Sequence, residues 1–203
     1  MSPAPPSLAR RERLALCDLL AELGPDVPTL CEGWRSADLA AHLYVREHRP
    51  DAGPGLAAPL GPLTTWSEKV QRDARDTMDW GSLIQAVRTG PPLWWRPLDL
   101  ALNTVEYFVH HEDVRRAQPN WEPRALVPED AALLWRRLAG VARLQGVTAK
   151  ARPGHPPAAS RYESDGLAPI VVTDKPGARV SGPPGEVLLW AMGRRQAARA
   201  DVA

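Results

Sequence analysis

Three side chains able to bind metals or transfer protons share a helical spacing within one stretch of the sequence, Asn103 to Arg116 (NTVEYFVHHEDVRR). Glu106 precedes His110 by four residues, and Asp113 follows His110 by three. Residues at these spacings lie on one face of a helix, with Cβ atoms about 5–6 Å apart. A carboxylate oxygen and an imidazole nitrogen each bind zinc at about 2 Å. The spacing indicates that Glu106 and His110 can share one divalent ion, although many such pairs are only solvated or hydrogen-bonded groups.

The helix that carries these residues has an apolar face, formed at three- and four-residue spacing by Leu98, Leu102, Val105, Val109 and Ala117. Glu106, His110 and Asp113 fall on that same face. A buried glutamate without a partner costs several kcal/mol or takes up a proton. We therefore expect a cation to compensate Glu106.

A third ligand is expected from an earlier helix. Ser36 is a good N-cap for a helix from Ala37 to about His48, which presents Leu39, His42, Leu43 and Arg46 inward. A lone inward histidine is usually a core residue, but His42 can complete a set with Glu106 and His110. Asp38 has two alternative roles, either holding the second ring nitrogen of His42 or placing a favourable charge in the first helical turn. Asp113 is a second outer partner candidate, close to His110.

The other three histidines are poor ligands by geometry. His48 is six residues from His42 and faces away, His111 is rotated off the inward face by one residue, and His155 lies in a Pro-rich loop.

The remaining pattern predicts a mainly α protein, a helical bundle with a small C-terminal α+β appendage. Residues 1–6 form a leader, and further helices are expected over 8–23 (capped by Ser7), 63–78, 80–87 and 128–145. The bundle spans 7–146. From 147 the runs VTAKAR, IVVT and GARVSG are strand-like, HPPAASRYESDG is a loop, and 183–200 is a final helix, which defines a small α/β domain over 147–203.

Composition excludes several classes of function. A net charge of +1 gives no electrostatic footprint for nucleic acid. No apolar run approaches the roughly 20 residues of a membrane span, and no signal-peptide core is present, so we expect a cytoplasmic monomer or homodimer with neither nucleic-acid nor membrane partners. Cys17 and Cys31 are too few for a disulfide framework and are expected to be reduced thiols.

Two motifs together resemble the mycothiol-dependent maleylpyruvate isomerase family, within the DinB-like superfamily of metal-binding four-helix bundles. The first is C-x-x-W-x-x-x-D-L-x-x-H, from Cys31 through Trp34 and Asp38 to His42. The second is E-x-x-x-H-x-x-D, at Glu106, His110 and Asp113. The spacing between them and the closing GEVLLWAMGR segment also match, so the resemblance covers nearly the whole chain. Within this family, the chain most resembles an actinobacterial branch of metal-binding proteins.

The resemblance implies a zinc-type site of His42, Glu106 and His110, completed by water. It also implies that the C-terminal part is the small α/β domain that lies over the metal pocket and helps to hold a thiol such as mycothiol. Arg194 matches an arginine that commonly follows the glycine of the last helix in that domain.

Three functions remain open at this point. The first is a thiol-dependent transferase or isomerase acting on a small electrophile, since three protein ligands and an open position are what a catalytic metal requires. The second is a non-catalytic metal-binding or ligand-sensing protein. The third is a small-molecule carrier, which the inward polar triad disfavours.

Overall fold

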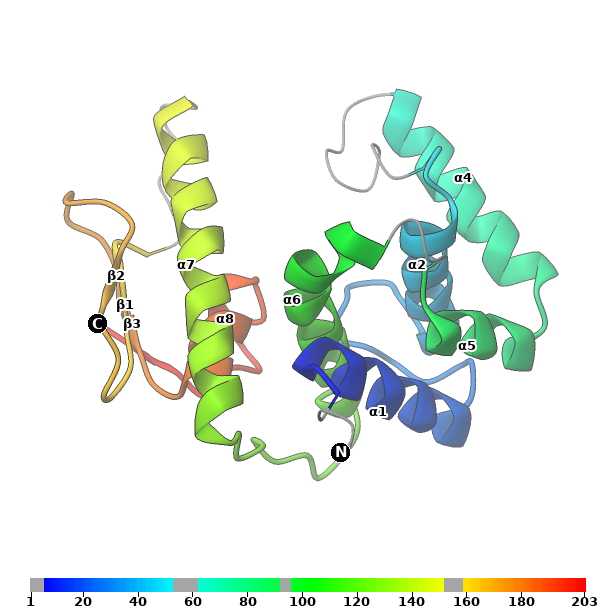
Figure 1. Cartoon of the computed structure of the whole chain (residues 1–203), viewed down its shortest axis with the longest axis horizontal. Helices are drawn as coiled ribbons and strands as arrows, with labels where there is room; N and C mark the ends of the chain where they lie inside the picture. Colours follow the sequence, from blue (N-terminus) through cyan, green and yellow to red (C-terminus); the bar gives the residue numbers. More distant parts are fainter. Residues whose placement is uncertain (1–5, 53–61, 92–95, 152–158) are drawn as a thin grey trace. The chain divides into compact units, whose positions relative to one another are not determined.

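The computed structural model describes residues 6–52, 62–91, 96–151 and 159–203, and the protein is mainly helical with one small sheet (Figure 1). The helices are α1 (Leu8–Leu23), α2 (Ser36–His48), α4 (Pro62–Thr77), α5 (Trp80–Thr89), α6 (Arg96–Arg115), α7 (Pro128–Ala151) and α8 (Pro184–Ala191). The strands are β1 (Arg161–Glu163), β2 (Ile170–Val171), β3 (Arg179–Ser181) and β4 (Asp201–Val202). No helix in these ranges combines the length and the apolarity needed to cross a membrane.

Local signals set the ends of the first two helices. The Ser7 side chain accepts a hydrogen bond from the Arg10 N–H at 3.4 Å, and Gly24 ends α1 with a φ of 86°, which confirms the predicted limits. The N-cap of α2 is Arg35, one residue before the serine predicted for that role. Ser36 is already helical, and its hydroxyl instead donates to the carbonyl of Gly24 at 2.6 Å.

Contacts divide the chain into two compact units, between Trp121 and Glu122. In the N-terminal unit α1 packs against α5 and α6, and α2 packs against α4 and α5. Their apolar faces form one core, whose fully buried members include Leu16, Cys17, Leu20, Leu39, Leu43, Val87 and Tyr107. The recurrence of leucines at helical spacing explains why these segments fold as helices with one inward face.

A buried ion pair joins three helices inside this core. Glu47 of α2 is 4% exposed and pairs with Arg13 of α1, whose Nη2 donates to Oε1 at 2.7 Å. From α6, the Tyr107 hydroxyl donates to the same oxygen at 2.8 Å and the Asn103 amide donates to it at 2.9 Å. The Arg13 guanidinium also lies over the Tyr107 ring, 4.2 Å from its centroid. Arg13, Asn103 and Tyr107 therefore all contact one carboxylate.

The C-terminal unit combines α7, α8 and a four-stranded sheet of order β2-β1-β3-β4. β1 runs antiparallel to β2 and parallel to β3, and β4 runs antiparallel to β3. Tyr162 and Val180 are fully buried on the central strands, and the Tyr162 ring lies 6.4 Å from that of Trp190 in α8. α7 packs on α8, and the indole N–H of Trp135 donates to the Ala168 carbonyl at 2.9 Å.

Three secondary-structure predictions in this half of the chain were wrong. Residues 147–151, predicted as a strand, continue α7. Gly146 does not end the helix, because an internal glycine costs a helix only about 1 kcal/mol. Arg161–Glu163, predicted as loop, is the strand β1, since pairing on both sides outweighs its polar composition. The final helix ends at Ala191, and Gly193 with a φ of 91° then turns the chain toward β4.

The predicted domain limits differ from the division by contacts. From the sequence, residues 128–145 were expected to belong to the bundle and a second domain was expected to begin at 147. Contacts instead group α7 with α8 and the sheet. The predicted leader lies outside the described residues except for Pro6, and so does His155.

Glu47→Ala is expected to lower the free energy of unfolding by about 3–5 kcal/mol, because it leaves Arg13 buried without its counter-charge. Urea denaturation of the full chain, followed by tryptophan fluorescence, measures this loss. Asp73→Ala, which removes the exposed ion pair with Lys69, is the control and should cost less than about 1 kcal/mol. Equal losses in the two variants would contradict the central role of Glu47.

Candidate metal centre

Helices α2 and α6 bring together the three ligands expected from the sequence. Donor atoms of His42, Glu106 and His110 all lie within 4.8 Å of one another. His110 Nε2 is 3.4 Å from Glu106 Oε2, and the rings of His42 and His110 meet edge to face with centroids 5.4 Å apart. Glu106 and His110 come from successive turns of α6, as their spacing predicted, whereas His42 reaches them from α2.

The donor set fits a divalent ion. Two imidazoles and one carboxylate form a set that catalytic zinc uses, with one position left for another ligand. Nδ1 of His42 is buried and has no hydrogen-bond partner among the described residues. Buried polar atoms nearly always have a hydrogen-bond partner, so a buried Nδ1 without one is an exception to that pattern.

The charges around the set favour a neutral His42 and an ionised Glu106. Burial, and then the neighbouring His110, lower the pKa of His42 from 6.5 to about 4. Burial alone would raise the pKa of Glu106, but His110, Arg46 and His42 outweigh it and lower that pKa to about 2. Two of the three ligands are thus already in the protonation state that coordination needs.

The environment of Glu106 differs from the one expected from the sequence. Glu106 is not an unpartnered buried carboxylate, because its side chain is 29% exposed and its Oε2 lies 3.7 Å from Nε of Arg46. Arg46 also donates to Asn103, which in turn contacts Glu47. Glu106 therefore does not require a metal ion for compensation, and the case for an ion rests on how the three ligands converge.

Asp113 holds the outer side of His110. Its Oδ2 lies 2.9 Å from His110 Nδ1, and the carboxylate is fully buried. Burial opposes the charged imidazole, but hydrogen bonding to Asp113, Cys31 and Glu106 raises the pKa of His110 well above its usual value. Asp113 thus occupies the position expected of a residue that orients a ligating histidine.

Asp38 takes the second of its two predicted roles. Its Oδ2 accepts the Arg35 N–H at 2.9 Å, which closes the N-terminus of α2, and its Oδ1 accepts from Arg75 Nη1 at 2.7 Å. It does not hold Nδ1 of His42, which has no hydrogen-bond partner in the part of the chain that the structure describes. The reason is the position of Asp38 in the first helical turn, where free N–H groups attract a carboxylate.

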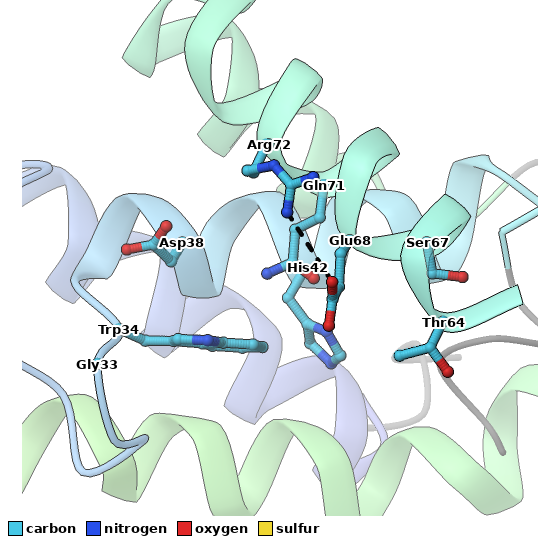
Figure 2. A pocket seen from close by; sticks show the side chains of 9 residues that line it. All are labelled: Gly33, Trp34, Asp38, His42, Thr64, Ser67, Glu68, Gln71 and Arg72. Atoms are coloured by element: carbon cyan, nitrogen blue, oxygen red, sulfur yellow. Dashed lines mark ion pairs between the residues drawn. The ribbon is translucent and has the colours of Figure 1, made fainter. Parts of the chain in front are cut away.

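A pocket of about 490 Å³ opens beside His42. Figure 2 shows the His42 ring between Trp34 on one side and the side chains of α4 on the other. The Trp34 and His42 rings are tilted against each other with centroids 5.1 Å apart. The remaining lining residues are Gly33, Asp38, Thr64, Ser67, Glu68, Gln71 and Arg72.

The polar groups of this pocket differ in how far they are already used. Glu68 and Arg72 are exposed and form a weak ion pair at 4.0 Å (Figure 2). Thr64 Oγ1 is buried without a hydrogen-bond partner among the described residues, whereas the Ser67 hydroxyl donates to carbonyls of the backbone. A small molecule in the pocket would meet an indole face, one unpaired hydroxyl and two exposed charges.

The other residues singled out from the sequence lie elsewhere. His111 pairs with buried Glu12 of α1 at 2.6 Å, and His48 stacks on Tyr44 with centroids 4.8 Å apart. Arg194 follows α8 in the C-terminal unit, where its Nη1 donates to the Met192 carbonyl at 2.6 Å.

The contribution of α4 to the pocket was not predicted from the sequence. The buried residues Ser67, Val70 and Ala74 are three and four apart and form a packed face, a weak signal that the sequence contained. The contact of Arg46 with Glu106 was not predicted either, since the sequence indicated only the inward position of Arg46.

The chain matches no protein-family model, no curated protein and no solved structure. The resemblance to the maleylpyruvate isomerase family therefore stays a prediction.

Mutation can distinguish the roles of Asp113 and Asp38. Asp113→Asn is expected to weaken Zn²⁺ binding about 10–100-fold, because it removes the charge that orients His110. Asp38→Ala should leave that affinity unchanged and lower the free energy of unfolding by about 1 kcal/mol through loss of the cap. Competition titration against a chromophoric chelator, together with urea denaturation, measures both. The reverse pattern would make Asp38 the outer partner of the site.

Proposed function

We propose that this protein binds a zinc-like divalent ion through His42, Glu106 and His110, and that it is a thiol-dependent transferase or isomerase acting on a small electrophile. The observation that carries the proposal is the convergence of three donor atoms within 4.8 Å, contributed by two helices that are far apart in the sequence. The adjoining pocket of about 490 Å³ supports a small-molecule substrate, because ligand sites are commonly about 300–1,000 Å³.

In this proposal the helical part of the chain has the DinB-like architecture. α1, α2 and α6 correspond to three of the four long helices of such a bundle. Facing helices of bundles are where metal sites are commonly built, which is consistent with ligands on α2 and α6.

The residues of the site have distinct roles in the proposed chemistry. A bound divalent ion would act as a Lewis acid that favours the thiolate form of a low-molecular-weight thiol such as mycothiol. His42, Glu106 and His110 hold the ion, and Asp113 fixes the tautomer and orientation of His110. Trp34 supplies a flat apolar wall on which the carbon skeleton of a substrate packs. Arg194 is the proposed thiol-binding residue of the C-terminal unit.

The alternative is a metal-binding or ligand-sensing protein without turnover. It is favoured by one observation, namely that the carboxylates nearest His42 and His110 are already engaged. Asp38 caps α2, Asp113 contacts His110, and Glu106 contacts His110 and Arg46. None of these three carboxylates is then free to act as a general base, and turnover depends on a thiol activated by the ion.

The first test is which histidine holds the ion. In a Cys17→Ser/Cys31→Ser background, which removes protein thiols as ligands, about one Zn²⁺ per chain should bind. His110→Ala and His42→Ala should each abolish stoichiometric binding, since each removes one of three ligands. His111→Ala should retain the ion, because His111 faces Glu12. Elemental analysis after dialysis measures the occupancy, and loss of the ion in His111→Ala alone would refute the proposed ligand set.

The second test concerns the thiol. In the same cysteine-free background loaded with Co²⁺, a millimolar small thiol should produce a sulfur-to-cobalt charge-transfer band, because the ion retains an open position. The band should be absent in Glu106→Ala, which removes the carboxylate ligand. If no thiol perturbs the cobalt spectrum between about pH 6 and 9 while the ion stays bound, the transferase proposal fails and the non-catalytic alternative stands.

A further inference from the structure

A second group of metal-binding side chains lies on the other side of His110. Cys31, His110 and Asp113 each offer a donor atom within 4.8 Å of the others. Cys31 Sγ donates to Asp113 Oδ2 at 3.3 Å, and the same oxygen lies 2.9 Å from His110 Nδ1. His110 thus directs Nε2 toward Glu106 and Nδ1 toward Asp113 and the thiol.

The loop before α2 holds the thiol against α6. The Leu30 N–H donates to the backbone carbonyl of Asp113 at 3.0 Å. This hydrogen bond fixes the loop to Asp113, whose side chain the Cys31 thiol contacts. The Cys31 N–H donates to Thr29 Oγ1 at 3.1 Å, and the Cys31 carbonyl accepts from the Trp34 N–H at 3.0 Å. Gly33, with a φ of 75°, allows the tight turn between them. Both the backbone and the side chain of Cys31 are therefore fixed before any ion arrives.

The donor types differ between the two sides of His110. The first set has nitrogen and oxygen donors only, whereas the second contains sulfur. Thiolate ligands favour soft and thiophilic ions over hard ones. Cys31 is half-buried, so an ion can reach its sulfur, and Asp113 Oδ2 lies 3.3 Å from that sulfur, where it can become a ligand.

We propose that Cys31, Asp113 and His110 Nδ1 form a second coordination set, which takes thiophilic divalent ions such as Cd²⁺ independently of His42 and Glu106. On binding, the Cys31 thiol and the Nδ1–H of His110 each release a proton to solvent, and the thiolate and Nδ1 coordinate the ion. Asp113 changes from the orienting partner of His110 into a ligand. Because His110 belongs to both sets, a thiophilic ion in the second set withdraws His110 from its contact with Asp113 and alters the first.

Cys17 is a matched control within the same chain. It is fully buried, its Sγ lies 3.9 Å from the Ile84 carbonyl, and burial raises its pKa from 9.0 to about 11. It belongs to no group of three metal-binding side chains among the described residues. A thiophilic ion should therefore distinguish the two cysteines.

The test is titration of the metal-free full chain with Cd²⁺ alone, followed by the thiolate-to-cadmium absorption in the ultraviolet. Wild type and Cys17→Ser should develop the band at about one equivalent. Cys31→Ser should lose it, because an ion bound by the remaining nitrogen and oxygen donors has no thiolate ligand. Circular dichroism of each variant establishes that it is folded.

Glu106→Ala separates this proposal from the proposed function. The band should persist in Glu106→Ala, because the second set does not use that carboxylate. A band that disappears in Glu106→Ala would mean that Cys31 binds only as part of the first site, and this would overturn a second set. A band that survives Cys31→Ser, or no band in wild type, would overturn it as well. None of these three results bears on Zn²⁺ binding measured in the cysteine-free background.

Discussion

The buried carboxylate of Glu47 is the interaction on which the N-terminal unit depends. It lies where α1, α2 and α6 meet, and it accepts hydrogen bonds from Arg13, Asn103 and Tyr107. An isolated carboxylate would be very costly to bury, so its burial is tolerable only when all three partners are in place. This requirement sets the register of α2 against α6, because hydrogen bonds are directional where apolar packing is not.

The same register places the candidate metal ligands. From Glu47 the polar contacts continue through Asn103 to Arg46 and on to Glu106. His110 and Asp113 then follow on successive turns of α6. A shift of α2 by one residue would break the contacts of Glu47 and would also rotate His42 away from His110. The structural and the candidate functional polar groups are therefore parts of one seam between two helices.

His110 is the residue at which this seam divides. Its two ring nitrogens face different donors, with Glu106 on one side and the Asp113–Cys31 pair on the other. Imidazole is unusual among side chains in having two separated nitrogens whose roles depend on each other. The contacts of Asp113 thus bear on both sets, and the proposed selectivity between nitrogen–oxygen and sulfur-containing coordination depends on that carboxylate.

The sequence alone determined the features that depend on spacing within a single helix. The spacing of Glu106, His110 and Asp113 predicts a shared face because the helical period is local, and the structure confirms that face. The helices over 8–23, 62–77 and 80–89 were predicted closely for the same reason, since caps and apolar periodicity act within a few residues.

Only the tertiary structure decided which of the available partners each side chain takes. Asp38 had two roles open to it and took the cap, and Cys31 reaches Asp113 across 82 positions of sequence. The contribution of α4 to the pocket and the pairing of Arg161–Glu163 into a sheet also depend on segments far along the chain. Such contacts arise from packing of whole elements, and residue types and spacing within one element carry no information about them.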